Sequence, residues 1–360
     1  MKGLHGIIFS YEKKSGLREL IENRVHGSIP FGGDYRVIDF ILSSMVNAGI
    51  TDVGVIMHGK CQSLLDHLGS GKSWDLSRNF GGLTLLPAFA YTERRGGDGQ
   101  FRGRVEALAS VINYLKGIRQ DYVVLADSDT VMNLPLEDVF RRHIDTGAGD
   151  GEDTYFTLDG MGRITDTAYA LYTPAGHRCL NVFVLRRDLL LELVAECASR
   201  NGYSLRRNIL QEMGARLKLY GYVYDGYAAH INTLQSYYDR SMELLSTAVR
   251  QALFCPQRPV YGKENDSPSG YIDPDGGCVN SLIADGCDIR GSVKNCILFR
   301  NVRIERGASV ENCILFKDTV VKKGASLHSV ITDKYVTVSE NVILTGHERY
   351  PMVVAKGATV

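Results

Sequence analysis

The sequence lacks a surplus of charge of either sign, long apolar runs and a secretion signal, and each absence excludes a class of protein. Its 360 residues carry 41 Lys and Arg against 41 Asp and Glu, so the formal net charge is zero. Domains that bind nucleic acid are usually basic. No apolar run reaches the 18 residues of a membrane span, and the first residues form no signal-peptide pattern. We therefore expect a cytoplasmic protein that binds neither nucleic acid nor membranes.

The eight cysteines form no C-x-x-C pair, and no group of cysteines and histidines has zinc-site spacing. Disulfide frameworks are typical of small secreted domains, so we expect reduced, mostly structural thiols and no metal. The length corresponds to about two domains. The proportions of apolar residues, 44%, and charged residues, 23%, are those of an ordinary folded chain.

The first 150 residues alternate strand and helix patterns. Strand patterns lie at 4–9, 52–57 and 122–126, and helix patterns lie at 35–48 and 105–115. Such alternation predicts an α/β domain with a mostly parallel sheet, helices on both faces, and a site at the carboxyl ends of the strands. A long helix is expected from about residue 233 to residue 254.

A linker and a repeat follow. Four of the nine prolines fall within residues 256–274, which neither a helix nor a central strand tolerates. We therefore place a first domain at 1–255, a linker at 256–276 and a second domain at 277–360.

The second domain repeats with a period of 17 residues. Residues 292–308 and 309–325 share Ser-Val-x-Asn-Cys-Ile-Leu-Phe at their start and Gly-Ala at their end, and a looser copy begins at Ser326. Short strands, turn glycines and a period close to three hexapeptides predict a parallel β-helix with one coil per repeat. A two-sheet sandwich would not repeat this octapeptide in register.

Several motifs, in order along the chain, point to a family. Residues 30–40 read Pro-Phe-Gly-Gly-Asp-Tyr-Arg-Val-Ile-Asp-Phe, and 47–50 read Asn-Ala-Gly-Ile. They resemble the P-F-G-G-K-Y-R-I-I-D-F…N-S-G-I segment of glucose-1-phosphate adenylyltransferases (ADP-glucose pyrophosphorylases). Leu-Leu-Pro-Ala at 85–88 and Phe-Arg-Gly at 101–103 resemble that family's L-L-P-A and Y-R-G. The resemblance implies that residues 1–255 form a nucleotidyltransferase-like domain, that the second domain is a left-handed parallel β-helix, and that the protein has a place in glycogen synthesis.

The chemistry that the resemblance implies has three requirements. In this family a sugar phosphate attacks the α-phosphate of ATP and pyrophosphate leaves, with the help of magnesium. A glycine-rich loop offers backbone N–H groups to the triphosphate. Cations neutralise the charge that develops on phosphorus, and two carboxylates hold the metal.

The glycine-rich loop is changed in this chain. The family has L-A-G-G-R-G-T-R-L after the first strand, whereas residues 9–17 read Phe-Ser-Tyr-Glu-Lys-Lys-Ser-Gly-Leu. Glu12 thus places a negative charge in the loop, and Gly16 stands at the position of an essential arginine. We expect that ATP binding is lost. The alternative is a rearranged loop in which Lys13 and Lys14 bind phosphate through their side chains.

The metal pair and the sugar-phosphate side are also altered. Alignment places the family's two metal-binding aspartates at Asp129 and His230, and Mg²⁺ prefers oxygen ligands. A zinc site at this pair has no visible third ligand. Arg102 is kept from the Y-R-G motif, but no lysine lies in the interval 163–178, where the family has one. We call Glu12, Gly16, Arg102, Asp129 and His230 the vestigial pocket.

These losses favour a regulatory, largely non-catalytic subunit that assembles with a catalytic glucose-1-phosphate adenylyltransferase paralogue, as a tetramer by family resemblance. The resemblance also places Arg24, His26 and Arg36 near the family's sugar-phosphate effector region, so we expect an anion there. No cofactor is expected on this chain, and Mg²⁺ would serve the catalytic partner. The alternative is an active nucleotidyltransferase with a rebuilt phosphate loop. A hexapeptide-repeat acyltransferase is disfavoured, because His328 has no identifiable supporting partner.

Overall fold

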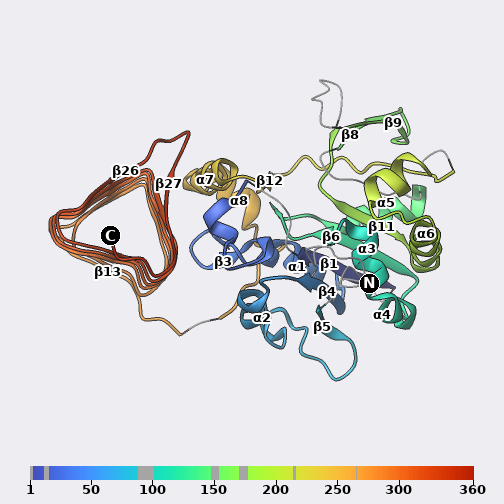
Figure 1. Cartoon of the computed structure of the whole chain (residues 1–360), viewed down its shortest axis with the longest axis horizontal. Coiled ribbons are helices and arrows are strands. Elements are labelled where there is room, and N and C mark those ends of the chain that lie inside the picture. Colours follow the sequence, from blue (N-terminus) through green and yellow to red (C-terminus); the bar gives the residue numbers. More distant parts are fainter. Residues whose placement is uncertain are drawn as a thin grey trace.

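The computed structural model describes residues 3–11, 16–87, 101–146, 154–169, 177–213, 216–264 and 266–360. They form an N-terminal α/β domain and a C-terminal β-helix (Figure 1). No helix in the described part of the chain is long and apolar enough to cross a membrane.

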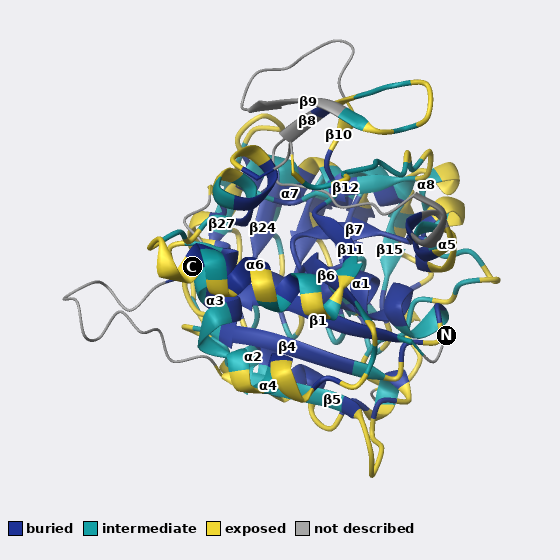
Figure 2. Ribbon diagram, turned by 90° about the vertical axis from the view of Figure 1, so that its right-hand side faces the viewer, coloured by how far each residue is buried: buried dark blue, intermediate teal, exposed yellow. Residues whose placement is uncertain are grey.

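The N-terminal domain is built on a five-stranded sheet in the order β11-β6-β1-β4-β5. Its strands are β1 (Leu4–Tyr11), β4 (Asp52–His58), β5 (Gly82–Pro87), β6 (Tyr122–Asp127) and β11 (Val182–Arg186). All neighbours pair in parallel except β11, which is antiparallel to β6. The predicted α/β class is therefore confirmed. The central strands run buried through the domain (Figure 2).

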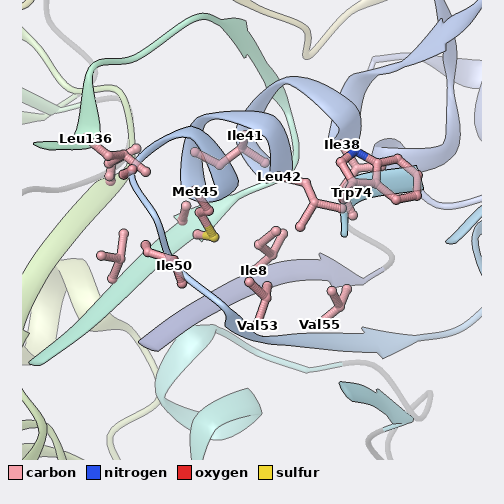
Figure 3. Close-up of a cluster of buried hydrophobic side chains, with 14 of the residues drawn as sticks. Ile8, Ile38, Ile41, Leu42, Met45, Ile50, Val53, Val55, Trp74 and Leu136 are labelled. Atoms are coloured by element: carbon pink, nitrogen blue, oxygen red, sulfur yellow. The ribbon is translucent and has the colours of Figure 1, made fainter. Parts of the chain in front are cut away.

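Helices cover both faces of this sheet because side chains alternate along its strands. In β1, Ile7 and Phe9 join one apolar cluster and Ile8 joins the other. The first cluster includes α3 (Arg104–Ser110), α4 (Ile112–Gly117), α6 (Arg187–Ser199) and the π-helical turn η5 (Leu205–Gln211). The second includes α1 (Val37–Asn47), α2 (Gln62–Leu68), η3 (Lys72–Trp74) and α5 (Leu136–Thr146). Figure 3 shows Met45 of α1 and Trp74 packed over Ile8, Val53 and Val55.

Smaller elements surround this core. They are η1 (Arg18–Ile21), η2 (His26–Ser28), β2 (Pro30–Phe31), β3 (Tyr35–Arg36), β7 (Thr130–Met132), β8 (Thr154–Leu158), β9 (Ile164–Tyr169), β10 (His177–Arg178), β12 (Ala228–His230), α7 (Leu234–Met242), η6 (Glu243–Leu245) and α8 (Thr247–Leu253). The helix expected at 233–254 is thus divided, since Ser246, at the N-cap position of α8, is extended. The helix pattern at 105–115 likewise breaks at Val111, between α3 and α4.

The C-terminal domain is the predicted left-handed β-helix, a prism of three five-stranded parallel sheets (Figure 1). The first contains β13 (Tyr271–Ile272), β16 (Asp288–Ile289), β19 (Arg303–Ile304), β22 (Val320–Val321) and β25 (Thr337–Val338). The second contains β14 (Gly277–Val279), β17 (Ser292–Lys294), β20 (Ser309–Glu311), β23 (Ser326–His328) and β26 (Ile343–Thr345). The third contains β15 (Leu282–Ile283), β18 (Ile297–Leu298), β21 (Ile314–Leu315), β24 (Val330–Thr332) and β27 (Met352–Val354).

The repeat is in register in three dimensions. Ser292 pairs with Ser309, which pairs with Ser326 in the looser copy. The third sheet faces the N-terminal domain, and its Ile314 shares an apolar cluster with Phe316 and Tyr237 of α7. The expected linker 256–276 includes β13, which already belongs to the stack because it pairs with β16. The many Pro and Gly residues around β13 led to its prediction as linker. A two-residue strand at a sheet edge nevertheless tolerates such neighbours.

Candidate functional site

The carboxyl ends of the central strands are occupied by a buried ion pair. Asp127 ends β6 beside Phe9 of β1. Arg104, the first residue of α3, donates from Nε to Asp127 Oδ1 at 2.9 Å and from Nη2 to Oδ2 at 2.5 Å. The two side chains are 4% and 1% exposed. The guanidinium also lies over the rings of Phe9 and Phe183, at 5.8 and 5.6 Å. It is therefore held on several sides.

Aromatic rings extend this filling along the same edge of the sheet. Phe101 lies edge-on to Tyr11 with ring centroids 5.3 Å apart, and 5.1 Å from the ring of His58. Tyr11 and His58 are the last residues of β1 and β4, so the rings close the strand ends next to the ion pair. We call Arg104, Asp127 and these three rings the strand-end cluster.

Asp129 and His230 come together, as the alignment expected for its two metal positions. β7 and β12 pair antiparallel with Thr130 opposite His230. His230 Nδ1 lies 3.6 Å from Asp129 Oδ1 and 3.2 Å from the hydroxyl of Thr130. Within the described residues, no three His, Cys, Asp or Glu side chains gather as a metal site would require. The pair offers one carboxylate and one imidazole, which suits Mg²⁺ poorly.

Of the remaining residues of the vestigial pocket, the structure describes Gly16 and Arg102. Glu12 lies outside the described residues. Gly16 donates to the carbonyl of Asn232 and accepts from the amide of Leu234, both at 3.0 Å, which ties it to the start of α7. Arg102 bonds Glu106 through its backbone N–H, and its guanidinium lies 4.9 Å from the ring of Tyr203. A surface role thus accounts for Arg102.

Two of the three expected effector residues, Arg24 and Arg36, lie where the two domains meet. Arg24 donates from Nη2 to both carboxylate oxygens of Asp333 at 2.7 Å, and both side chains are buried. Its Nη1 is buried with no hydrogen-bond partner among the described residues. Such an unsatisfied charged donor is costly unless a ligand completes it.

Two more cations stand near Arg24. Arg36, the N-cap of α1, donates to Ser63, and burial lowers its pKa to about 10. Lys334 follows Asp333 in the β-helix. Burial, reinforced by Arg36 and Arg24, lowers the pKa of Lys334 to about 7. His26 is buried in η2. We call Arg24, Arg36 and Lys334 the anion cluster.

Two features of the site were not predicted from the sequence. The Arg104–Asp127 pair was not anticipated, although Arg104 follows directly after the Phe-Arg-Gly motif and Asp127 ends a strand pattern. An arginine directly after the Phe-Arg-Gly motif, together with an aspartate at the end of this strand, would indicate from sequence that an ion pair fills the pocket. Lys334 and Asp333 lie about 300 residues from Arg24, and no local pattern links them.

Comparison with known proteins agrees with this architecture. Residues 15–160 match the "Nucleotidyl transferase" family model, and residues 270–349 match "GlmU-like, C-terminal hexapeptide". A glycogen biosynthesis protein GlgD from Bacillus subtilis (strain 168) is 36% identical over 352 residues, covering 98% of this chain and 95% of that protein. The chain belongs to the glucose-1-phosphate adenylyltransferase family.

Within this family, the chain is similar to proteins of two descriptions. A second glycogen biosynthesis protein GlgD, from Geobacillus stearothermophilus, is 35% identical over 84% of this chain and 81% of its own length. A glucose-1-phosphate adenylyltransferase from Fervidobacterium nodosum is 28% identical over 86% of this chain and 77% of its own length. The resemblance seen in the motifs and the predicted two-domain fold are thus confirmed.

Proposed function

We propose that this chain is a regulatory, largely non-catalytic subunit of glucose-1-phosphate adenylyltransferase in glycogen biosynthesis. In this proposal it modulates a catalytic paralogue that makes ADP-glucose and pyrophosphate from ATP and glucose 1-phosphate. The observation that carries the proposal is the buried Arg104–Asp127 ion pair at the carboxyl ends of the strands.

The ion pair bears on catalysis because this edge is where an open α/β sheet binds its ligand. Nucleotidyl transfer needs cationic donors aimed at the charge that develops on phosphorus. Arg104 instead gives two of its hydrogen bonds to Asp127 and is packed between two aromatic rings. A nucleotide phosphate at this point would meet a guanidinium already neutralised by a carboxylate.

The metal positions support the same proposal. Magnesium chemistry relies on carboxylate oxygens, and His230 supplies a nitrogen in place of one of them. We therefore assign Mg²⁺ to the catalytic partner, not to this chain.

The anion cluster supports the regulatory half of the proposal. Three cationic groups face the domain junction, and one buried guanidinium nitrogen of Arg24 lacks a partner among the described residues. A sugar phosphate would supply the missing acceptor oxygens and neutralise the excess charge. Because Arg24 and Asp333 come from different domains, an anion here would act on the domain junction itself.

The β-helix supports assembly with a partner. The strands of its first coil, β13, β14 and β15, are each at the edge of a sheet and carry the exposed apolar residues Tyr271, Ile272 and Val279. Open strand edges with apolar side chains are usually covered by another chain. We propose that the partner is the catalytic subunit, in a hetero-oligomer and, by family resemblance, a tetramer.

Turnover by the isolated chain tests the proposal. The purified chain, supplied with Mg-ATP and glucose 1-phosphate, is expected to form little ADP-glucose, because loss of one transition-state donor costs about 10²–10³ in rate. A catalytic paralogue assayed at the same concentration is the positive control. Robust turnover by this chain alone would contradict the proposal and favour an active nucleotidyltransferase with a rebuilt phosphate loop.

A further inference from the structure

Residues 346–351 interrupt the last coil of the β-helix. They connect β26 to β27 and form a small hairpin in which His347 and Tyr350 exchange backbone hydrogen bonds at 3.1 and 2.8 Å. Tyr350 is 62% exposed. The 17-residue repeat neither requires nor contains such a segment. Formation of the β-helix coil therefore does not explain why the segment is present. We call residues 346–351 the strap.

The strap leaves the β-helix and reaches the N-terminal domain at two points. Arg18 donates from Nη1 to the hydroxyl of Tyr350 at 2.5 Å, and its guanidinium lies 5.4 Å from the centre of the same ring. Gln235, in the first turn of α7, donates from Nε2 to the carbonyl of Glu348 at 2.7 Å. These contacts lie beside each other, because Gly16 is bonded to both sides of the α7 N-cap.

Arg18 is strained where the strap holds it. Its φ of +49° is in the left-handed region, which residues other than glycine enter at an energetic cost. Such conformations persist only when surrounding contacts impose them. The hydrogen bond and the cation–π contact with Tyr350 are contacts of that kind. Without them the strain at Arg18 would be less well compensated, so the strap contacts favour the arrangement seen here.

The strap is joined at its base to the anion cluster. β27, which follows the strap, pairs with β24, and the amide of Asp333 donates to the carbonyl of Val354 at 2.9 Å. Asp333 in turn holds Arg24. The β-helix therefore contacts the N-terminal domain at two residues that are close in sequence. It contacts Arg18 through the strap and Arg24 through the neighbouring coil.

We propose that the strap is a coupling element, which transmits the occupancy of the anion cluster to the segment of Gly16 to Arg18 at the border of the vestigial pocket. The part of this inference that concerns the anion rests on the function proposed above. An anion bound at Arg24 would weaken the attraction between the guanidinium and the carboxylate of Asp333. The backbone amide of Asp333 is in turn hydrogen-bonded to β27, the strand that anchors the strap. By linkage, an anion that favours the docked strap must bind more weakly when the strap cannot dock.

Hydrogen exchange on the full chain tests the strap without any ligand. The amides of Leu20 and Glu22 donate within the segment after Arg18. In Tyr350→Ala they are expected to exchange about three- to tenfold faster, which corresponds to the loss of one hydrogen bond and one cation–π contact. Tyr350→Phe keeps the ring and should give an intermediate value.

The matched control is Tyr271→Ala. Tyr271 is 51% exposed and lies 5.9 Å from the guanidinium of Arg290, but both residues belong to the β-helix. This variant should leave the exchange of Leu20 and Glu22 unchanged. Equal exchange in wild type, Tyr350→Ala and Tyr350→Phe would overturn the strap proposal.

Sulfate as the probe separates this inference from the proposed function. Sulfate is expected to slow exchange at Leu20 in the wild type, and to do so less than half as much in Tyr350→Ala. If sulfate raises the melting temperature of the wild type but slows Leu20 equally in both proteins, the anion cluster stands and the coupling is refuted. If sulfate neither binds nor protects the wild type, the anion cluster is refuted and with it the coupling.

Discussion

Replacing Arg104 by Met should destabilise the N-terminal domain far more than a surface arginine would. The change keeps an apolar stem, removes the two hydrogen bonds to the Asp127 carboxylate and takes the Arg104 charge away from this carboxylate, which is 1% exposed. Breaking one side of a buried ion pair costs about 3–5 kcal/mol. At about 2–4 °C per kcal/mol for a domain of this size, the melting temperature should fall by about 6–20 °C.

The control lies two residues away. Arg102→Met removes an exposed arginine whose ion pair with Glu106 is long, at 3.4 Å, so its cost should stay below about 1 kcal/mol. The double variant Arg104→Met, Asp127→Leu should recover much of the loss, because an apolar pair of similar volume replaces a buried ion pair at little cost. Thermal unfolding followed by circular dichroism measures all three. If Arg104→Met melts no lower than Arg102→Met, the Arg104–Asp127 ion pair does not stabilise the N-terminal domain.

Two further predictions concern ligands. Mg-ATP should raise the melting temperature of this chain little. A ligand that binds the native state stabilises it by about 2.7 kcal/mol at a hundred times its Kd. A large shift in melting temperature that Asp129→Asn abolishes would mean that the pocket still binds Mg-ATP. Sulfate should bind about tenfold more weakly at pH 8 than at pH 6. Burial beside two arginines lowers the pKa of Lys334 to about 7, so this lysine loses its positive charge as the pH rises through that value. Titration calorimetry measures this, with Lys334→Arg expected to flatten the dependence; equal affinity at both pH values would exclude Lys334 from the site.

The fold was predictable because its signals are periodic and local. The buried strands of the N-terminal domain read as short apolar runs, and the β-helix repeats an octapeptide at a period of 17. Boundaries were less predictable, since β13 is a two-residue strand within a Pro- and Gly-rich segment. Helical periodicity does not show the break at Ser246, where the chain leaves the 3-10 turn η6 in an extended conformation before α8 begins.

The site was predictable in part. The proximity of His230 and Asp129 agrees with the alignment to the family's two aspartates. Asp129 precedes β7, His230 ends β12, and these two strands pair. The fate of Arg24 was not predictable, since its partner Asp333 lies in the other domain. Nor did the sequence reveal that Arg104 turns inward onto Asp127 while Arg102 stays at the surface. Two arginines in one motif differ in this way only once the packing of α3 against β6 is known.

The most direct test of the regulatory role is a mixing experiment. The purified chain and its catalytic paralogue are combined, a sugar-phosphate effector is titrated, and ADP-glucose formation is recorded together with the mass of the oligomer. We predict a hetero-oligomer whose maximal rate or effector affinity differs from that of the catalytic chain alone, and an effector response that Arg24→Gln weakens. Two chains that do not co-migrate, with kinetics identical to those of the catalytic chain by itself, would contradict the account.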